Sequence, residues 1–425
     1  MCARRHYSIV CSSCGARYED DGLILDCPMT HEPAFLRTEY DSQYRPGTGE
    51  HGLFRHAALL PATRTFAEAP EPVVYPATQL GHALGLTRLW VAFSGYWPER
   101  DTAMLTGTFK ELEAYTVLGR LPETPPVLVV ASAGNTAAAF AWAATRYRVP
   151  CLIVLPASAM ERMRFPGPLD PCVRLVVLDG ATYNDAIACA ELFARLPKHQ
   201  AEGGARNVAR RDGLGVVMLS AADALGRLPD VYVQAVGSGT GAIGAHEAAR
   251  RLRGDSDVPL PRVLMCQNTP YAPLLHAWRS DPGPIPGSAM DVLAPELTNG
   301  RPPYAMRGGV RDVLAESGGE VLAVDNEAAL AAMVLCEQTE GIDIEPGAGV
   351  ALAALAEAVR SGRVSRDEVV LLNVTGGGRA RLAEDMALVP AEPWLRIPAG
   401  PSGASDDPAE PMRRLLDYVA TPSGA

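Results

Sequence analysis

The chain has 425 residues, of which 48% are hydrophobic and 20% charged, and its formal net charge is −11 at pH 7. This length exceeds one ordinary compact core, so two domains are expected, and the composition is that of a globular protein. The acidic balance argues against a nucleic-acid binder, and no apolar run approaches the ~18 residues that a membrane span needs.

Residues 1–45 hold four cysteines among short β-like runs, and residues 46–100, rich in Pro, Gly and Ala, predict a connecting arm. Beyond residue 100, apolar runs alternate with helical patterns. Strands are expected at 126–132, 151–156, 174–179, 231–236, 262–267, 321–324 and 368–374. Helices are expected at 111–120, 135–147, 183–196, 215–225, 243–252, 327–340 and 349–361. This alternation predicts an α/β fold of parallel sheets flanked by helices.

The domain limits follow from these patterns. We expect an N-terminal segment (1–45), a large domain (46–107 and 226–395), a small domain on the substrate side (108–225) and a C-terminal tail (396–425). The tail is rich in Pro, Gly, Ser and Asp, a composition typical of loose structure.

The cysteines and the N-terminus indicate the compartment. The nine cysteines are an odd number and lie mostly in apolar segments, which favours reduced thiols over a disulfide framework. The first ten residues lack the apolar core of a signal peptide. We therefore expect a cytoplasmic protein.

Lysine is almost absent from this chain. Of 38 basic residues only Lys110 and Lys198 are lysines, and Lys110 lies where a loop meets a helix, after Thr106-Gly-Thr-Phe. Arginine stays charged and cannot form an imine, so a retained lysine can mark a need for an amine. The positive end of the helix dipole lowers the pKa of such an amine and favours its nucleophilic form. The alternative is an exposed lysine that has not been replaced.

Three loops that follow predicted strands can bind ligands. The first reads Ser132-Ala133-Gly134-Asn135-Thr136, and its hydroxyls and N–H groups suit a carboxylate or phosphate. The alternative for this loop is a plain helix cap and turn. Another loop reads Asn373-Val-Thr375-Gly-Gly-Gly378, where a hydroxyl can bond a ring nitrogen and glycines allow a close backbone approach. The alternative there is a glycine-rich turn.

The remaining loop is the most glycine-rich, reading Gly237-Ser238-Gly239-Thr240-Gly241. Its N–H groups can cradle a phosphate. Residues 239–244 also satisfy the dinucleotide pattern G-x-G-x-x-G, but the next strand ends in Gln267-Asn268 without the carboxylate that would bind a ribose. A phosphate loop is favoured over a dinucleotide loop.

Taken in order, these residues resemble the fold type II (β-family) of pyridoxal-5′-phosphate (PLP) enzymes over residues 80–390. The resemblance implies two tryptophan synthase β-like domains and a homodimer. It also implies that Lys110 holds PLP as an imine. The cofactor would further be bound by Asn135, Gly237, Ser238, Gly239, Thr240, Gly241 and Thr375. The substrate carboxylate would be held by Ser132, Ala133, Gly134 and Thr136.

The branch within this family is indicated by further segments. Cys11-Ser-Ser-Cys14 and Gly341-Ile-Asp-Ile-Glu-Pro346 are similar to threonine synthases, although Thr108-Phe-Lys-Glu departs from their usual Ser-Phe-Lys-Asp. Residues 207–213, 299–304 and 373–378 look more like those of cysteate synthases, which replace the phosphate of O-phosphoserine with sulfite. The substrates implied are a small amino acid and an anionic nucleophile.

The resemblance also implies roles in this reaction. Lys110 would remove the Cα proton and return it, and Thr375 would leave the ring nitrogen of PLP unprotonated. Thr108 would contact the substrate. The anionic substrates require local positive charge, for which Arg210, Arg211 and Arg301 are candidates by motif position. The alternative for each arginine is a surface charge.

The N-terminal cysteines resemble a zinc ribbon. Cys11, Cys14 and Cys27 offer three soft ligands, and His31 offers a fourth. The second Cys-x-x-Cys pair of a ribbon is broken, because Cys27 is followed by Pro-Met-Thr. A bound structural zinc and a metal-free remnant stabilised by packing both remain open.

Competing functions make different predictions. A threonine synthase would act on O-phosphohomoserine, and the residues around Lys110 count against it. A catalytically inactive PLP-fold binding protein would have no reason to retain Lys110. A dehydrogenase fails on the missing ribose carboxylate.

Overall fold

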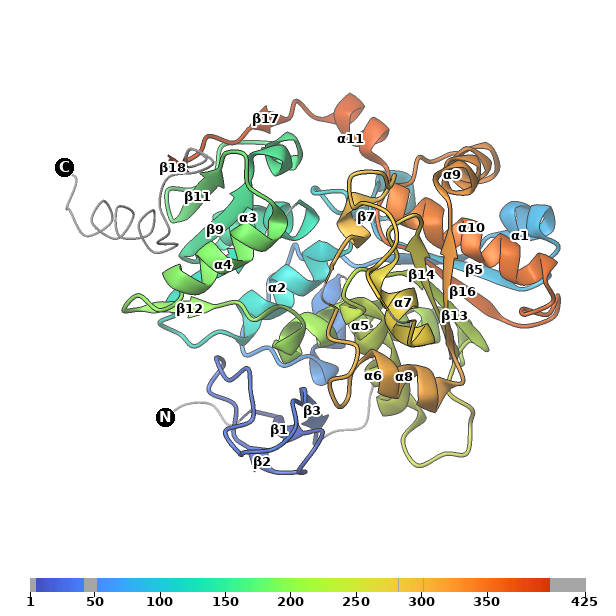
Figure 1. Ribbon diagram of the computed structural model, residues 1–425, viewed down its shortest axis with the longest axis horizontal. Coiled ribbons are helices and arrows are strands. Elements are labelled where there is room, and N and C mark those ends of the chain that lie inside the picture. Colours follow the sequence, from blue (N-terminus) through green and yellow to red (C-terminus); the bar gives the residue numbers. More distant parts are fainter. Residues whose placement is uncertain (1–4, 42–51, 133, 282, 301, 398–425) are drawn as a thin grey trace. The chain divides into compact units, whose positions relative to one another are not determined.

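The computed structural model describes residues 5–41, 52–132, 134–281, 283–300 and 302–397. The chain divides into two compact units, and each is described by itself. Unit 1 comprises Met1–Glu123 and Gly203–Ala387, and unit 2 comprises Thr124–Glu202 and Leu388–Ala425. Figure 1 shows their helices and strands.

A small antiparallel sheet opens unit 1. Its strands, in the order β2-β1-β3, are β1 (Tyr7–Cys11), β2 (Arg17–Tyr18) and β3 (Leu36–Tyr40). Alternate residues of β1 and β3 point to one face, where Tyr7, Ile9, Cys11 and Leu36 form a small core with Val208. This packing ties the N-terminal sheet to the rest of unit 1.

The main sheet of unit 1 has six strands in the order β15-β14-β13-β16-β5-β4. They are β4 (Val73–Pro76), β5 (Leu89–Phe93), β13 (Val231–Ala235), β14 (Arg262–Asn268), β15 (Glu320–Val324) and β16 (Val370–Val374). Neighbouring strands run parallel except β4, which pairs antiparallel with β5. The carboxyl ends of the parallel strands therefore lie at one edge of the sheet.

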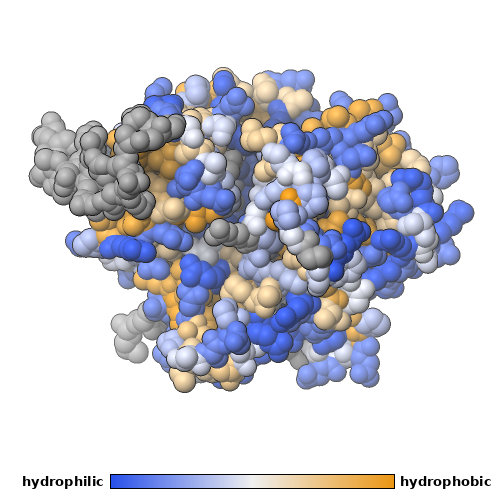
Figure 2. Space-filling model, viewed as in Figure 1, coloured by the Kyte–Doolittle hydropathy of each residue, from blue (hydrophilic) through white to orange (hydrophobic). Residues whose placement is uncertain are grey.

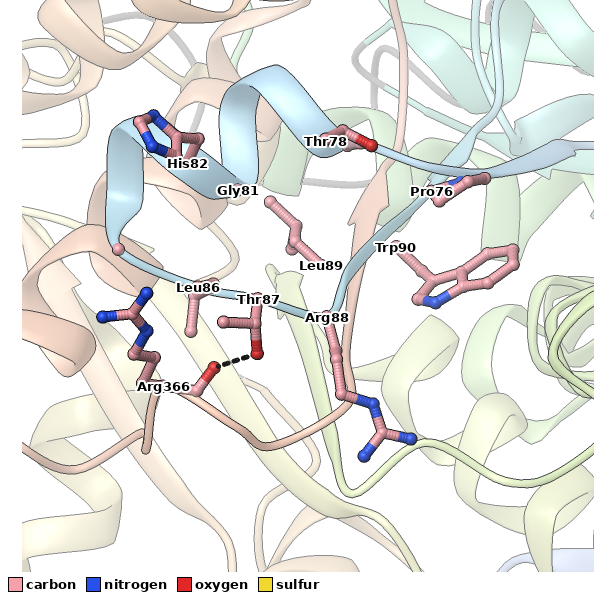
Figure 3. Close-up of a pocket in the computed structure, with 12 residues that line it drawn as sticks. Pro76, Thr78, Gly81, His82, Leu86, Thr87, Arg88, Leu89, Trp90 and Arg366 are labelled. Atoms are coloured by element: carbon pink, nitrogen blue, oxygen red, sulfur yellow. Dashed lines mark hydrogen bonds between the residues drawn. The ribbon is translucent and has the colours of Figure 1, made fainter.

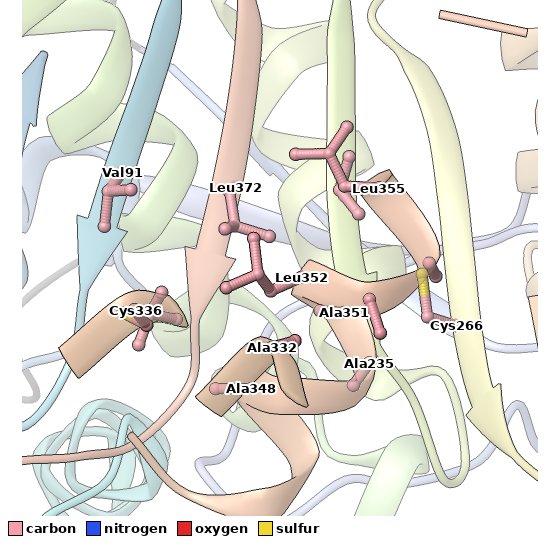
Figure 4. Packing of buried hydrophobic residues seen from close by; sticks show 14 of the residues in the cluster. Val91, Ala235, Cys266, Ala332, Cys336, Ala348, Ala351, Leu352, Leu355 and Leu372 are labelled. Atoms are coloured by element: carbon pink, nitrogen blue, oxygen red, sulfur yellow. The ribbon is translucent and has the colours of Figure 1, made fainter. Parts of the chain in front are cut away.

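Helices α9 and α10 cover one face of this sheet. Ala332 and Cys336 of α9 and Leu352 of α10 pack against Val91 and Leu372 of the strands (Figure 4). The longer helices of unit 1 are α2 (Lys110–Arg120), α5 (Val208–Leu225), α6 (Thr240–Arg253), α9 (Asn326–Glu340) and α10 (Pro346–Arg360).

Helices α2, α5 and α6 pack together through glycines. A Cβ added to Gly213 would lie 2.5 Å from the carbonyl oxygen of Leu112, and one added to Gly215 would lie 2.7 Å from that of Gly244. A Cβ on Gly244 would lie 2.0 Å from the carbonyl oxygen of Arg211. Backbone therefore contacts backbone where these helices cross.

Unit 2 contains a parallel sheet of five strands in the order β12-β8-β9-β11-β18. The strands are β8 (Val127–Ala131), β9 (Cys151–Pro156), β11 (Val173–Leu178), β12 (His199–Ala201) and β18 (Leu395–Ile397). The helices of this unit are α3 (Asn135–Tyr147) and α4 (Tyr183–Phe193). Val129, Leu152 and Val176 of the sheet pack with Ala186 and Phe193 of α4 in an apolar core.

Shorter elements complete both units. In unit 1 they are η1 (Leu53–Leu59), α1 (Thr78–Leu84), β6 (Tyr96–Trp97), η2 (Pro98–Arg100), β7 (Thr102–Ala103), η4 (Gly204–Arg206), α7 (Pro273–Arg279), η5 (Pro295–Leu297), α8 (Val310–Ser317) and α11 (Arg379–Asp385). In unit 2 they are η3 (Ala157–Arg162), β10 (Arg164–Phe165) and β17 (Val389–Pro390). The range 46–100, expected to be an arm, thus contains α1 and two strands of the main sheet.

The compact units do not coincide with the domain limits expected from the sequence. Residues 108–123 and 203–225 belong to unit 1, because α2 and α5 pack against each other and against α6. Residues 388–395 belong to unit 2, because β17 pairs with β10 and β18 pairs with β11. The predicted parallel-sheet architecture with flanking helices is confirmed.

On the face seen in Figure 2, hydrophilic residues are interspersed with hydrophobic ones. Within the described ranges, none of the helices has both the length and the apolar character needed to cross a bilayer.

Candidate active site

Lys110 begins α2 beside the loop that follows β16. The Phe109 N–H donates to the carbonyl oxygen of Thr375 at 3.0 Å, and Thr108 forms an antiparallel bridge with Gly376. The structure therefore brings Lys110 and Thr375, which are 265 positions apart in the chain, into one region of unit 1.

A buried carboxylate lies next to the lysine amine. Lys110 Nζ is 3.4 Å from Glu113 Oε2, and Arg210 of α5 lies 3.2 Å from Glu113 Oε1. The Glu113 side chain is fully buried, whereas that of Lys110 keeps 23% of its surface exposed. The sequence reasoning missed Glu113, although the i,i+3 spacing places it on the helix face of Lys110. Arg210, expected to bind substrate, thus lies beside the lysine.

A second carboxylate, Glu111, stabilises the loop before the lysine. It accepts hydrogen bonds from the Thr106 N–H at 2.6 Å and from the Thr106 hydroxyl at 2.9 Å. Burial of this side chain raises the pKa of Glu111 to about 7, although the Thr106 hydrogen bonds lower it.

The glycine-rich loop joins β13 to α6 and also lies at Lys110. A Cβ on Gly241 would be 2.5 Å from Gln234 Nε2 and 3.1 Å from the Phe109 ring. Gly239 has φ +83°, and a Cβ there would be 2.4 Å from Val310. The positive φ and Val310 favour glycine at position 239, and a side chain at position 241 would have to displace the Gln234 amide. The hydroxyls of Ser238 and Thr240 are 2.7 Å apart at the positive end of α6, which suits a phosphate group.

The loop after β16 is also closely packed. A Cβ on Gly377 would be 2.3 Å from the carbonyl oxygen of Asp343, and one on Gly376 would be 3.0 Å from that of Gly107. The Glu345 N–H donates to the carbonyl oxygen of Gly376 at 2.9 Å. The glycines thus bring Thr375 beside Lys110 and connect it to the segment 341–346.

A buried polar group lies under these loops. Asn373 Nδ2 donates to the Tyr232 hydroxyl at 2.9 Å, and that hydroxyl donates to Gln234 Oε1 at 2.6 Å. Asn373 Oδ1 is buried and has no hydrogen-bond partner among the described residues. An amine, a glycine-lined anion cradle, a hydroxyl and this unsatisfied amide therefore converge at one edge of the sheet. This set of an amine, backbone and hydroxyl donors and one acceptor, Asn373 Oδ1, that is free within the described part of the chain fits a phosphorylated heterocycle such as PLP.

Unit 2 carries the loop after β8. The Ser132 hydroxyl accepts from the Gly134 N–H at 3.2 Å and from the Ala137 N–H at 3.0 Å, and so caps α3. Arg162 donates to Asn135 Oδ1 at 2.7 Å, a positive charge that the sequence reasoning missed. Thr136 lies in the first turn of α3. Ala133 lies outside the described residues.

Arg211 and Arg301 are the other two arginines that the sequence predicted to bind the substrate. Arg211 is fully buried, donates to the carbonyl oxygen of Leu36 and pairs with Glu247 at 3.3 Å. Protein groups occupy its guanidinium, so we assign it a structural role in place of the expected substrate contact. Arg301 lies outside the described residues.

The four predicted metal ligands come together near the N-terminus. The ligand atoms of Cys11, Cys14, Cys27 and His31 all lie within 4.8 Å of one another. They form a separate cluster in the N-terminal part of unit 1.

A hollow of about 520 Å³ in unit 1 is not part of this site. Figure 3 shows that it is lined by Leu86, Arg88 and Arg366, with Thr87 donating to the carbonyl oxygen of Arg366 at 3.0 Å. It lies where β5 and β16 begin, whereas Thr375 follows the end of β16. Ligands of parallel sheets bind at the carboxyl ends of strands.

The comparisons with known proteins agree with this geometry. The family model "Pyridoxal-phosphate dependent enzyme" matches residues 71–376. A protein named cysteate synthase from Methanoregula boonei is 44% identical over 92% of this chain and 94% of its own length. One of the same name from Methanosarcina barkeri is 40% identical over 91% of this chain and 96% of its own.

Solved structures support the fold. Maize serine racemase is 19% identical, with a TM-score of 0.58 over 73% of this chain and 90% of that chain. Serine racemase from Dictyostelium discoideum is 17% identical, with a TM-score of 0.56 over 72% of this chain and 91% of that chain. The protein belongs to the pyridoxal-phosphate dependent enzyme family, among relatives that carry the name cysteate synthase.

Proposed function

We propose that this enzyme converts O-phospho-L-serine and sulfite to L-cysteate and phosphate. The observation that carries the proposal is the 40–44% identity to proteins named cysteate synthase over more than nine-tenths of the chain. The cluster around Lys110 supports it, because an amine, an anion cradle and a cation are what this replacement needs. A homodimer in the cytoplasm is part of the proposal, and the mass in solution, measured by light scattering, tests the dimer.

The residues of unit 1 would hold PLP in defined ways. Lys110 Nζ would attach the aldehyde carbon, the loop from Gly237 to Gly241 would bind the phosphate, and the Thr375 hydroxyl would face the ring nitrogen. When bound, PLP withdraws electrons from the substrate Cα. A neutral partner at the ring nitrogen suits elimination and replacement at Cβ.

Lys110 would also move the proton. Once the substrate amine has released it from the cofactor, the free Lys110 amine would take the proton from Cα, the Cβ–O bond would break and phosphate would leave. A sulfite sulfur would then bond to Cβ, and Lys110 would return the proton to Cα. Glu113 accepts a hydrogen bond from the lysine while it is charged, and Arg210 pairs with the other oxygen of Glu113. Ser132, Asn135 and Thr136 would bind the substrate carboxylate and the cofactor, and Thr108 the substrate.

The first test is the absorbance spectrum of the purified protein with added PLP. We expect a visible band that is absent in Lys110→Ala and present in the matched control Lys198→Ala, because Lys198 is an exposed residue of unit 2. Phosphate release from O-phosphoserine and sulfite-dependent formation of cysteate complete the test. Turnover of O-phosphohomoserine alone would make the protein a threonine synthase, and a band without any turnover would make it an inactive PLP-binding protein.

A further inference from the structure

The cysteine and histidine cluster has the spacing of a metal site. Cys14 Sγ and Cys27 Sγ are 3.8 Å apart, and Cys11 Sγ is 3.3 Å from His31 Nε2. Two sulfurs that each lie about 2.3 Å from a tetrahedral ion are about 3.8 Å apart. A disulfide would bring them to about 2.05 Å. The observed spacing therefore fits sulfurs that share an ion.

The turn after β1 places two of these sulfurs. The Gly15 N–H donates to the carbonyl oxygen of Cys11 at 3.0 Å, and Gly15 has φ +71°, which favours glycine. The Ser13 N–H lies 3.4 Å from Cys11 Sγ and donates to it. Backbone donors to sulfur stabilise a thiolate, which is the form that binds metals.

His31 is held in the orientation of a ligand. Its Nδ1 lies 2.6 Å from the carbonyl oxygen of Glu32 and donates to it. The hydrogen is therefore on Nδ1, and the lone pair of Nε2 points to the cluster. Histidines that bind metals nearly always make such a hydrogen bond with their other nitrogen.

We propose that Cys11, Cys14, Cys27 and His31 bind one zinc ion. Three thiolates and one imidazole are ligands that favour zinc over hard cations such as magnesium or calcium. All four positions are filled by protein groups, as in a structural site. The ion lies outside the candidate active site, so it takes no part in the chemistry.

The ion fixes the segment that follows His31. The Ser12 N–H donates to the carbonyl oxygen of Phe35 at 3.0 Å, and the Phe35 N–H donates to that of Arg307 at 2.9 Å. The Arg307 N–H in turn donates to the carbonyl oxygen of Pro33 at 3.1 Å. The zinc-bound turn and the loop before α8 are therefore joined through residues 33–35.

This connection reaches the glycine-rich loop. A Cβ on Gly308 would lie 2.6 Å from the Ser12 hydroxyl, and Val310, at the start of α8, fills the space beside Gly239. Loss of zinc frees the segment 31–36 and loosens the packing that supports Gly239. The affinity for PLP then falls about fivefold or more, as is typical of coupled sites.

The test measures zinc in the untagged, full-length protein by inductively coupled plasma mass spectrometry. We expect one zinc per chain in the wild type, and almost none in Cys14→Ser and His31→Ala. The matched controls are Cys189→Ser and His199→Ala, which remove a thiol and an imidazole from unit 2. They should retain one zinc per chain.

A second measurement guards against variants that fail to fold. Zinc removed from the wild type by a chelator should lower the melting temperature and the PLP affinity, and added zinc should restore both. A reduced wild type that takes up no zinc overturns the proposal. So does a mass lower by two hydrogens that maps to a Cys14–Cys27 disulfide. Zinc content is independent of the substrate, so a failure of the proposed reaction leaves this result unaffected.

Discussion

The two parallel sheets differ in what they bury. Strands β13, β14 and β16 of unit 1 bury Gln234, Gln267, Asn268 and Asn373 towards their carboxyl ends. The central strand β9 of unit 2 buries only Cys151 and the apolar residues that follow it. Buried polar groups have to be hydrogen-bonded, so they constrain a sheet more specifically than apolar packing does. The comparison teaches that the sheet of unit 1, whose strands bury polar side chains near their carboxyl ends, is the one suited to the proposed cofactor site, whereas the sheet of unit 2 is built by apolar packing.

The largest expected loss of stability comes from breaking a buried charge pair in unit 1. Arg120 has 1% of its surface exposed and donates to both oxygens of Asp20, at 2.7 and 2.9 Å. Arg120→Ala leaves Asp20 buried without this partner and should lower the free energy of unfolding by about 3–5 kcal/mol. Urea denaturation measures it. Arg174→Ala, at an exposed position of unit 2, is the control. If both variants lost a similar amount of unfolding free energy, burial of the Arg120 charge would not be the cause.

A deletion in the apolar sheet should cost somewhat less. Ile153 of β9 is fully buried, and Ile153→Ala should lower the free energy of unfolding by about 2–4 kcal/mol through lost burial and a cavity. The affinity for PLP should not change, because no polar group moves. Ile153→Val, expected to cost about 1 kcal/mol, is the control. A large loss of PLP affinity in Ile153→Ala would contradict the passive role of this sheet.

The charge on Glu111 should appear in the pH dependence of stability. Burial raises its pKa from 4.5 to about 7, so the folded protein binds this proton more tightly than the unfolded chain does. The resulting stability is present below pH 4.5 and is lost as the pH rises through 7. Glu111→Gln keeps an oxygen that accepts the Thr106 hydrogen bonds but cannot become charged, so its stability is not lost at high pH. At about pH 8 it should be more stable than the wild type by about 1–3 kcal/mol.

Denaturation at about pH 5 and about pH 8, on either side of the folded-state pKa, checks the Glu111 prediction. The gain should be small under the more acidic condition, where the wild-type carboxyl is mostly protonated in the folded state. Glu337→Gln, an exposed change on α9, serves as the control. An equal gain at both pH values would show that burial of the charge is not its cause.

The smallest effect concerns one hydroxyl of the glycine-rich loop. Ser238→Ala removes a single hydrogen-bonding group at the proposed phosphate site, while the backbone N–H groups remain. A hydrogen bond contributes about 0.5–1.5 kcal/mol, so the dissociation constant of PLP should rise about twofold to tenfold. A fluorescence titration measures it, with Ser361→Ala at the exposed end of α10 as control. A complete loss of binding would mean that this hydroxyl, and not the backbone, holds the phosphate.

Much of the fold could be predicted, because buried parallel strands are continuous apolar runs. The strands at Cys151–Pro156 and Val231–Ala235 are where this pattern put them. The start of α5 was placed too late, at residue 215, because Gly213 and Gly215 interrupt the helical pattern. They lie inside the helix to admit a neighbouring backbone, and a local pattern does not report such long-range contacts.

The parts of the candidate site that belong to a local sequence motif could be predicted. The parts that depend on how distant helices pack could not. Lys110, Thr375 and the loop from Gly237 to Gly241 are brought to one sheet edge, as loops after parallel strands should be. The partnership of Glu113 with Arg210 depends on the crossing of α2 and α5, which no spacing in the sequence encodes. Their roles in catalysis remain predictions.

The contact of backbone with backbone between α5 and α6 has a mechanical consequence. Where α5 and α6 meet through Gly215 and Gly244, no side chain lies between the two backbones. The two helices should therefore move together as one rigid unit. Arg210 lies in the first turn of α5, and the glycine-rich loop opens α6. Backbone contacts therefore fix the distance between the first turn of α5 and the first turn of α6, and only the Arg210 side chain, paired with Glu113, can still move between them.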